Sequence, residues 1–107
     1  MARISIIGPS GRQERQLFRH NSLGRHPRNT HQVLDRVVSK EHCHIELIDD
    51  GYVLKDLGSL NGTYVNGERV NGQKALKSGD EITIGSTRII FDPPERRGSM
   101  TFDALLS

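Results

Sequence analysis

Residues 56–67 read Asp56-Leu57-Gly58-Ser59-Leu60-Asn61-Gly62-Thr63-Tyr64-Val65-Asn66-Gly67. The stretch contains two Asn-Gly pairs, and this dipeptide favours tight turns because both of its residues tolerate a positive φ angle. It lies between segments whose apolar and polar side chains alternate, which is typical of strands. We therefore expect a loop that joins strands here, with the polar Asn61 at its turn.

Short alternating segments, rather than helical periodicity, fill residues 1–92. The apolar positions that alternate are Ile4/Ile6, Ile45/Leu47, Tyr52/Leu54, Ile82/Ile84 and Ile89/Phe91, and Leu17 lies in a further strand-like run from Gln13 to His20. Turn signals separate the segments at Asp50-Gly51, Asn66-Gly67, Asn71-Gly72, Ser78-Gly79-Asp80 and Gly85-Ser86. Many short strands with closely spaced turns predict an all-β fold, an antiparallel β-sandwich.

Composition restricts the class of protein. The 107 residues fit one domain, and a single cysteine, Cys43, allows no internal disulfide, which suits a reducing, cytoplasmic compartment. No apolar run approaches membrane-spanning length. The formal net charge is only +2, but residues 1–40 hold eight Lys/Arg against two Asp/Glu, whereas residues 41–107 hold seven against eleven. A basic half on a near-neutral protein favours a local anion site over general nucleic-acid binding.

The composition changes at Pro93. Residues 93–99 read Pro-Pro-Glu-Arg-Arg-Gly-Ser, which is typical of a linker. Beyond it Phe102, Leu105 and Leu106 have helical spacing, but the segment is too short to form a stable helix alone. We therefore expect a binding domain at 1–92 and, at 93–107, a linker toward a downstream domain of a longer protein.

Four polar side chains stand in segments between the expected strands. They are the guanidinium of Arg25, the hydroxyl of Ser39, the ammonium of Lys40 and the carboxamide of Asn61. Each one alone is an ordinary surface or turn residue. Together they are the groups needed to hold a phosphate and one adjoining backbone amide.

The blocks in their order resemble the forkhead-associated (FHA) domain, a β-sandwich that binds phosphothreonine peptides. The resemblance rests on Gly24-Arg25, Ser39-x-x-His42 and Asn61-Gly62, and it extends from about Ile4 to Phe91. It implies about eleven short strands in two twisted sheets, with the peptide lying across loops at one end. It also implies a module without catalysis, metal or cofactor that recognises a partner phosphorylated on threonine by a Ser/Thr kinase.

The resemblance also implies a role for each matching residue. Arg25 and Ser39 would hold the phosphate, and Lys40 would stand where a basic or amide residue often assists. Asn61 would bond the peptide backbone beside the phosphothreonine. Support for the site would come from Gly24, from His42 bracing the loops without touching the ligand, and from Gly62 permitting the turn.

One position departs from the family pattern. The family often has Thr directly before the Asn-Gly pair, where its hydroxyl helps to hold the phosphate, but this chain has Leu60. One donor is therefore missing, and the small pocket that favours threonine over serine is altered. Further candidates for peptide specificity are Arg36, Val37 and Thr63.

Three other functions compete with this interpretation. Catalysis or metal binding is suggested by Cys43 between His42 and His44, but the two histidines would share one face of a strand while Cys43 points away, and no third ligand has suitable spacing. Nucleic-acid binding is suggested by eight Arg and His residues within 12–31, although few aromatics interleave them. The third is a structural sandwich with a silent phosphate site.

The tail adds a hypothesis about self-association. Residues 96–99, Arg-Arg-Gly-Ser, precede Met100 and Thr101 and look like a target of a basophilic kinase. A phosphorylated Thr101 would dock into the pocket of its own or a neighbouring molecule, aided by the high effective concentration of a tethered group. A plain interdomain connector is the alternative.

Overall fold

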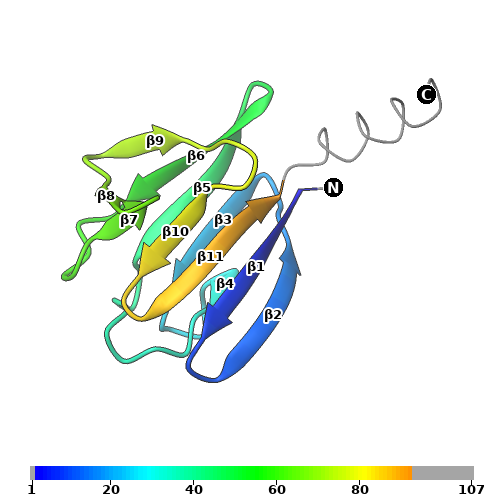
Figure 1. Cartoon of the computed structure of the whole chain (residues 1–107). Helices are drawn as coiled ribbons and strands as arrows, with labels where there is room; N and C mark the ends of the chain where they lie inside the picture. Colours follow the sequence, from blue (N-terminus) through cyan, green and yellow to red (C-terminus); the bar gives the residue numbers. More distant parts are fainter. Residues whose placement is uncertain (1, 93–107) are drawn as a thin grey trace.

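Eleven strands form two facing sheets in the computed structural model, which describes residues 2–92 (Figure 1). The six-stranded sheet has the order β2-β1-β11-β10-β7-β8, and the five-stranded sheet has the order β4-β3-β5-β6-β9. The strands are β1 (Arg3–Gly8), β2 (Gly11–Gln16), β3 (His20–Gly24), β4 (His31–Gln32), β5 (Cys43–Ile48), β6 (Gly51–Asp56), β7 (Thr63–Val65), β8 (Glu68–Arg69), β9 (Gln73–Ala75), β10 (Glu81–Ile84) and β11 (Thr87–Asp92).

The predicted β-sandwich of about eleven strands is confirmed, with two local differences. Strand β4 runs parallel to β3, whereas the other strand pairs are antiparallel. The strand-like run from Gln13 to His20 is broken, because β2 ends at Gln16 and the chain crosses to the other sheet before β3 begins at His20. At this crossing Leu17 is buried, and its N–H donates to Ala2 O (2.8 Å). No helix long and apolar enough to cross a membrane occurs among residues 2–92.

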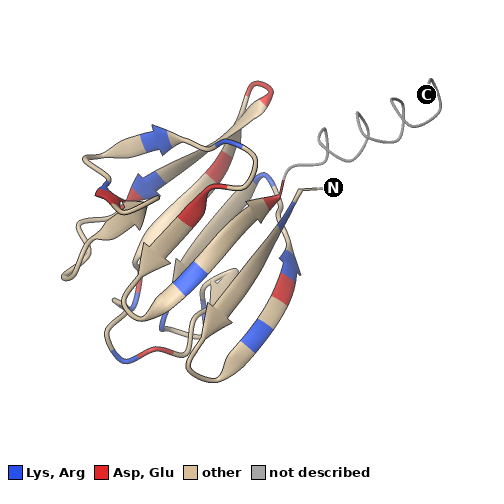
Figure 2. Ribbon diagram, viewed as in Figure 1, with Lys and Arg blue, Asp and Glu red and all other residues tan. Residues whose placement is uncertain are grey.

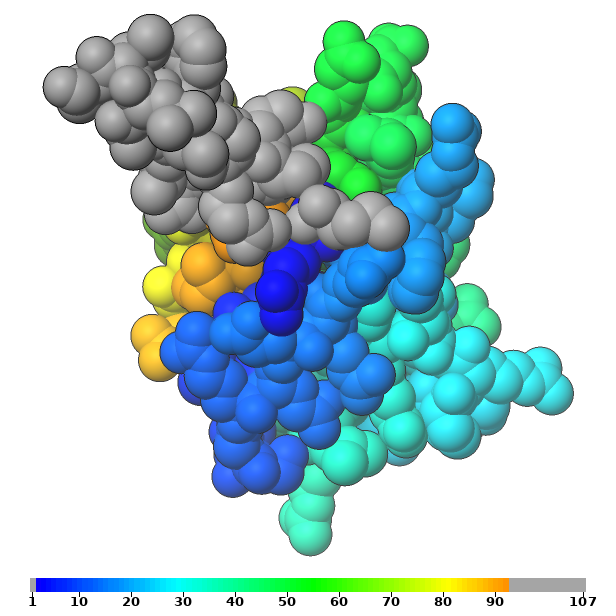
Figure 3. Space-filling model, turned by 90° about the vertical axis from the view of Figure 1, so that its right-hand side faces the viewer, coloured from blue at the N-terminus to red at the C-terminus, as the bar shows by residue number. Residues whose placement is uncertain are grey.

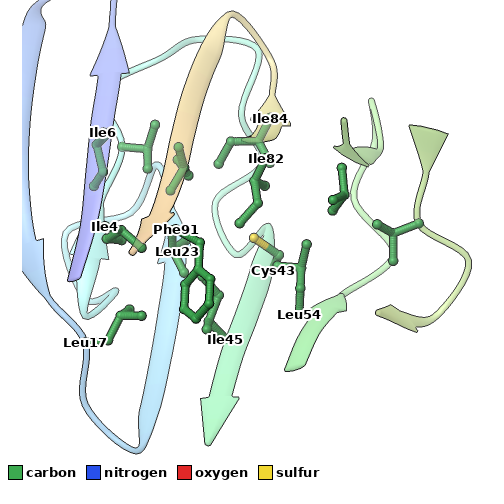
Figure 4. Close-up of a cluster of buried hydrophobic side chains, with 14 of the residues drawn as sticks. Ile4, Ile6, Leu17, Leu23, Cys43, Ile45, Leu54, Ile82, Ile84 and Phe91 are labelled. Atoms are coloured by element: carbon green, nitrogen blue, oxygen red, sulfur yellow. The ribbon is translucent and has the colours of Figure 1, made fainter. Parts of the chain in front are cut away.

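The core lies between the two sheets and is built from the alternating apolar positions (Figure 4). Ile4, Ile82 and Ile89 from one sheet and Ile45 and Leu54 from the other are at most 1% exposed. Burying each such side chain contributes about 1.5–3 kcal/mol relative to leaving it in water. The alternation in the sequence therefore becomes one apolar layer that holds the two sheets together.

Hairpin turns occur where the turn residues predict them. Between β7 and β8, Asn66 and Gly67 have φ angles of 51° and 87°, as a tight turn with two left-handed residues requires. Between β10 and β11, Gly85 has a φ of 59° and packs against the side chain of Asp35. The first turn fixes the register in which β7 pairs with β8, and the second fixes the register of β10 with β11.

A buried polar cluster joins the first strands of the five-stranded sheet. Asn21 donates its amide to Phe18 O and to Ile45 O (2.8 and 2.9 Å) and accepts from His31 Nε2 (3.0 Å). Burial, with the nearby charge of Arg15, lowers the pKa of His31 from 6.5 to about 4. The ring is therefore neutral at pH 7, and it ties β4 to β3.

His31 predicts a pH dependence of stability. Because its pKa is lower in the folded chain than in the unfolded chain, its contribution is complete above about pH 6.5 and is lost as the pH falls toward 4. Urea unfolding of the wild type at several pH values should therefore show stability that rises over this interval. The slope should be smaller in His31→Gln than in the wild type. Equal slopes in His31→Gln and the wild type would contradict this role.

The expected linker lies outside the described residues. The division into a domain at 1–92 and a linker at 93–107 remains a prediction, and so does the docking of a phosphorylated Thr101.

Candidate functional site: a junction of three loops

Three loops meet at one end of the sandwich, between β3 and β4, between β4 and β5, and between β6 and β7 (Figure 1). The first two are joined by backbone hydrogen bonds from Arg25 N to Ser39 O (3.0 Å) and from His26 N to Lys40 O (3.2 Å). The third loop is joined to the second by Leu60 N, which donates to Ser39 Oγ (3.1 Å). Residues far apart in sequence therefore share one small surface.

Gly24 sets how closely the first two loops approach. A Cβ atom at this position would overlap the carbonyl group of Lys40 and would lie 2.9 Å from Asn29 Nδ2. The same Lys40 carbonyl accepts a hydrogen bond from Asn29 Nδ2 (2.7 Å). A larger residue at position 24 would push the second loop, and Ser39 with it, away from Arg25.

The protein holds the Arg25 side chain in place through only one of its three side-chain nitrogens. Its Nε donates to Val38 O (3.1 Å), which holds the guanidinium beside Ser39. The side chain is exposed, and no carboxylate of residues 2–92 forms an ion pair with it. Its two terminal nitrogens can therefore bond an external anion in a forked geometry.

The hydroxyl oxygen of Ser39 already accepts one hydrogen bond from the protein. Its Oγ accepts the N–H of Leu60, and a hydroxyl that accepts one bond still has its own O–H to donate. The residue is partly buried at the junction of the loops. Ser39 and Arg25 thus bring two donors from different loops to one surface.

His42 is the buried brace between two of the loops. Its side chain is fully buried; Nδ1 accepts from Ser39 N (3.1 Å), so Nε2 carries the hydrogen that bonds Gly62 O (2.8 Å). Its backbone N–H donates to Leu23 O, and its carbonyl accepts from Leu57 N. The position of Ser39 therefore depends on the ring of His42, which faces away from solvent.

The side chain of Asn61 is exposed, and one of its amide hydrogens is already bonded within the protein. Its Nδ2 donates one hydrogen to Val37 O (2.9 Å), which fixes the carboxamide across the second and third loops. The second amide hydrogen and Oδ1 remain to bond an extended backbone. The neighbouring Leu60 is 86% exposed and Val37 is 44% exposed, so apolar side chains flank the carboxamide.

The other candidates divide into exposed and buried positions. Lys40 and Arg36 are exposed, and neither forms an ion pair within residues 2–92. Thr63 has no exposed surface, and its hydroxyl donates to Asp56 Oδ1 (2.6 Å). As the first residue of β7, Thr63 faces the core and is bonded there, and its role as a specificity residue stays a prediction.

Asp35 is a supporting residue that the sequence analysis missed. Its carboxylate accepts from Val37 N (3.0 Å), Ser86 N (2.8 Å) and Thr87 Oγ1 (2.8 Å), which ties the second loop to the turn between β10 and β11. Burial alone would raise the pKa of Asp35, but these hydrogen bonds outweigh it and hold the pKa below its usual value. A lone Asp between Leu34 and Arg36 offers no local signal for this role.

Asp56 organises the third loop in the same manner. It accepts from Gly58 N, Ser59 N, Ser59 Oγ and Thr63 Oγ1 at 2.6–3.2 Å. Burial pushes the pKa of Asp56 up, but the bonds from Ser59, Thr63 and Gly58 together lower it. The Asp-x-x-Ser spacing is a turn signal that would have found this residue from sequence.

The histidines on either side of Cys43 have different environments. His42 is buried between loops, whereas His44 is partly exposed in the outer surface of β5, so the expectation that they share a face is wrong. The cause is that β5 begins only at Cys43. Burial raises the pKa of the Cys43 thiol to about 12, and no group of three or more His, Cys, Asp or Glu among residues 2–92 is placed to hold a metal ion.

Charge around the loops is mixed. The loop between β4 and β5, at the foot of Figure 2, carries both basic and acidic positions, and so does the edge strand β2. In the view of Figure 3 the segment near residue 30 projects from the right-hand side of the body. The acidic Asp35 is buried and hydrogen-bonded, so the exposed charged residues of the second loop near Ser39 are Arg36, Lys40 and Glu41.

Comparison with known families identifies the domain family of this chain. The family model described as "FHA domain" matches residues 21–85, which include all three loops. The chain belongs to the FHA domain family. The FHA resemblance expected from the three blocks of sequence is thereby confirmed.

Solved structures share the whole sandwich. One, from a structural and functional analysis of phosphothreonine-dependent FHA domain interactions, is 31% identical with a TM-score of 0.79, covering 86% of this chain and 95% of its own. Another, the FhaA FHA domain complexed with the intracellular domain of Rv3910, is 32% identical with a TM-score of 0.77, covering 85% and 99%.

Curated relatives carry the names of regulators. The oxoglutarate dehydrogenase inhibitor of Corynebacterium efficiens is 44% identical over 65% of this FHA chain and 49% of its own length. The glycogen accumulation regulator GarA of Mycobacterium tuberculosis is 40% identical over 72% of this chain and 47% of its own. The chain thus spans about half the length of the curated relatives it matches.

Proposed function

We propose that this FHA domain is a phosphothreonine-peptide recognition module, without catalysis of its own, in a protein regulated by a Ser/Thr kinase. Family membership supports the proposal, as does the solved neighbour from a study of phosphothreonine-dependent interactions. The names of the relatives, a regulator and an inhibitor, favour a binding role over catalysis.

The proposal depends on one observation. Two hydrogen-bond donors from separate loops are held in place by the protein, and each still has N–H or O–H groups that can bond a ligand. The guanidinium of Arg25 is held through Nε by Val38 O, and the hydroxyl of Ser39 is held by Leu60 N. A phosphate that carries nearly two charges at neutral pH bonds several such donors at once. Pre-orientation lowers the entropy lost on binding, so the bonds contribute more to affinity.

The rest of the site fits a phosphorylated residue within an extended peptide. The free groups of Asn61 can bond the peptide backbone, and Lys40 adds a positive charge beside Ser39. No step of this recognition requires a metal or cofactor. The supporting residues Gly24, His42 and Gly62 act by holding the loops together rather than by touching the ligand.

The partner is a protein phosphorylated on threonine. Because the chain matches about half of each curated relative, we place the module within a longer protein whose other parts supply the output. We place it in the cytoplasm, where the buried thiol of Cys43 stays reduced.

The test compares peptide libraries that carry phosphothreonine, phosphoserine or unmodified threonine at a fixed position. We expect at least about tenfold stronger retention of phosphothreonine than of threonine peptides, the effect of one or two charge-assisted hydrogen bonds. Ser39→Ala should reduce this ratio several-fold, whereas Ser10→Ala, an exposed serine in the β1–β2 turn, should not. Equal retention of all three libraries would show that the phosphate site is silent, and stronger retention of duplex DNA than of phosphothreonine peptides would favour nucleic-acid binding instead.

A further inference from the structure

An arginine that no motif singled out stands over the third loop. Arg69 is on β8, the edge strand of the six-stranded sheet, and pairs across the strands with Tyr64 on β7 (Figure 1). Cross-strand partners project from the same face of a sheet. Thr63 and Val65 are buried on the other face, so Arg69 and Tyr64 lie on the outer one.

The guanidinium of Arg69 rests on Gly62. A Cβ atom at Gly62 would lie 3.2 Å from Arg69 Cζ and Nε and 3.3 Å from Tyr64 Cε1. The absence of a side chain at Gly62 thus makes room for both groups. The carbonyl of Gly62 is bonded to the buried His42, so the surface beneath Arg69 is tied to Ser39 through one ring.

The charge of Arg69 is not neutralised by the protein. The side chain is exposed, and among residues 2–92 it forms no ion pair. The adjacent Glu68 pairs with Val65, and successive strand residues point to opposite faces, so its carboxylate is directed away from Arg69. The cation is therefore open to a group from outside.

The distance from Arg69 to the phosphate site matches the length of a few residues of a bound peptide. Ser39 Oγ lies 3.1 Å from Leu60 N, and two residues of chain lead from Leu60 to Gly62. The surface beneath Arg69 therefore begins within about 10 Å of the Ser39 hydroxyl, a span that an extended peptide covers in about three residues. A peptide that passes Asn61 toward β8 would bring its flank to Arg69.

We propose that Arg69, resting on Gly62 beside Tyr64, is a specificity residue that selects an acidic side chain within about three residues of the phosphothreonine. The proposal rests on the proposed function of the same domain. An exposed pair of opposite charges is worth a modest amount, so we expect a two- to fivefold preference, an order-of-magnitude figure for such pairs.

The experiment uses phosphothreonine peptides that differ only in carrying Glu, Gln or Lys at each flanking position in turn. The wild type should favour Glu at one position within about three residues of the phosphothreonine. Arg69→Gln should lose this preference while still retaining the phosphothreonine peptide, and Arg69→Glu should favour Lys at the same position. Arg3→Gln, which removes an exposed charge from the far end of β1, should behave as the wild type.

The outcomes separate the two proposals. If the wild type does not distinguish phosphorylated from unmodified peptides, the proposed function fails. If it does distinguish them but shows no acidic preference, or keeps that preference in Arg69→Gln, the inference about Arg69 is wrong. A loss in Arg69→Gln that is equal for the Glu, Gln and Lys peptides would also overturn it, because Arg69 would then serve the phosphate itself.

Discussion

Replacing Arg25 with Ala is expected to weaken binding of a phosphothreonine peptide by at least about tenfold. A charge-assisted hydrogen bond is worth about 1.5–3 kcal/mol, and a forked guanidinium makes two of them to a phosphate. The side chain is exposed and forms no ion pair within residues 2–92, so its terminal nitrogens have little other use in the fold. Isothermal titration with one phosphothreonine peptide measures the loss.

Two further variants separate a specific contact from general attraction. Arg25→Lys keeps the charge but loses the fork and the bond from Nε to Val38 O, so it should lie between Ala and the wild type. Arg28→Ala removes an exposed charge from the same loop and should change the affinity much less. If Arg28→Ala and Arg25→Ala weaken binding equally, the loop acts only through the general electrostatic attraction of its positive charges. If Arg25→Ala binds as the wild type, the phosphate pocket has been wrongly placed.

Replacing His42 with Ala is expected to cost about 3 kcal/mol in the free energy of unfolding. The change removes a fully buried ring, opens a cavity and leaves Ser39 N–H and Gly62 C=O without their partner. A small domain has roughly 5–15 kcal/mol in total, so the loss is a large fraction of its stability. Urea unfolding measures it directly.

The same variant should also weaken peptide binding beyond the fraction of molecules that unfold. His42 holds Ser39 and Gly62 in place, so without it the second and third loops lose their common support. His44→Ala is the matched control, because His44 is only partly buried, in the outer surface of β5. A His42→Ala protein as stable as His44→Ala would show that the ring is not the brace. Normal affinity in its folded fraction would show that the brace does not govern the site.

The class of fold was predictable because it follows from local chemistry. Alternation of apolar side chains at Ile4/Ile6 or Ile82/Ile84 marks strands with one buried face, and Asn66-Gly67 marks a turn whatever lies around it. The parallel pairing of β3 with β4 was not predictable. It depends on how the intervening loop folds back, and Asn29 holds that loop through the Lys40 carbonyl.

The sequence indicated which residues to expect at the candidate site, but not how each of them is bonded. The ordered blocks around Arg25, Ser39 and Asn61 indicated the family, and the structure brings these residues to one junction of loops. The burial of Thr63 and the buried carboxylate of Asp35 were not foreseen. Both depend on partners distant in sequence, since Asp35 bonds Ser86 and Thr87 some fifty residues away.

By itself the amino-acid sequence determined which segments become strands, where the chain turns and which polar groups are available at the loops, because these properties depend on neighbours a few residues apart. Only the tertiary structure decided which of those polar groups remain available to bond a ligand. Arg25 keeps its terminal nitrogens because Val38 O takes only Nε, and Arg69 on β8 can rest over the third loop because Gly62 of that loop has no side chain to fill the space. Such outcomes depend on packing between distant segments, which no local pattern records.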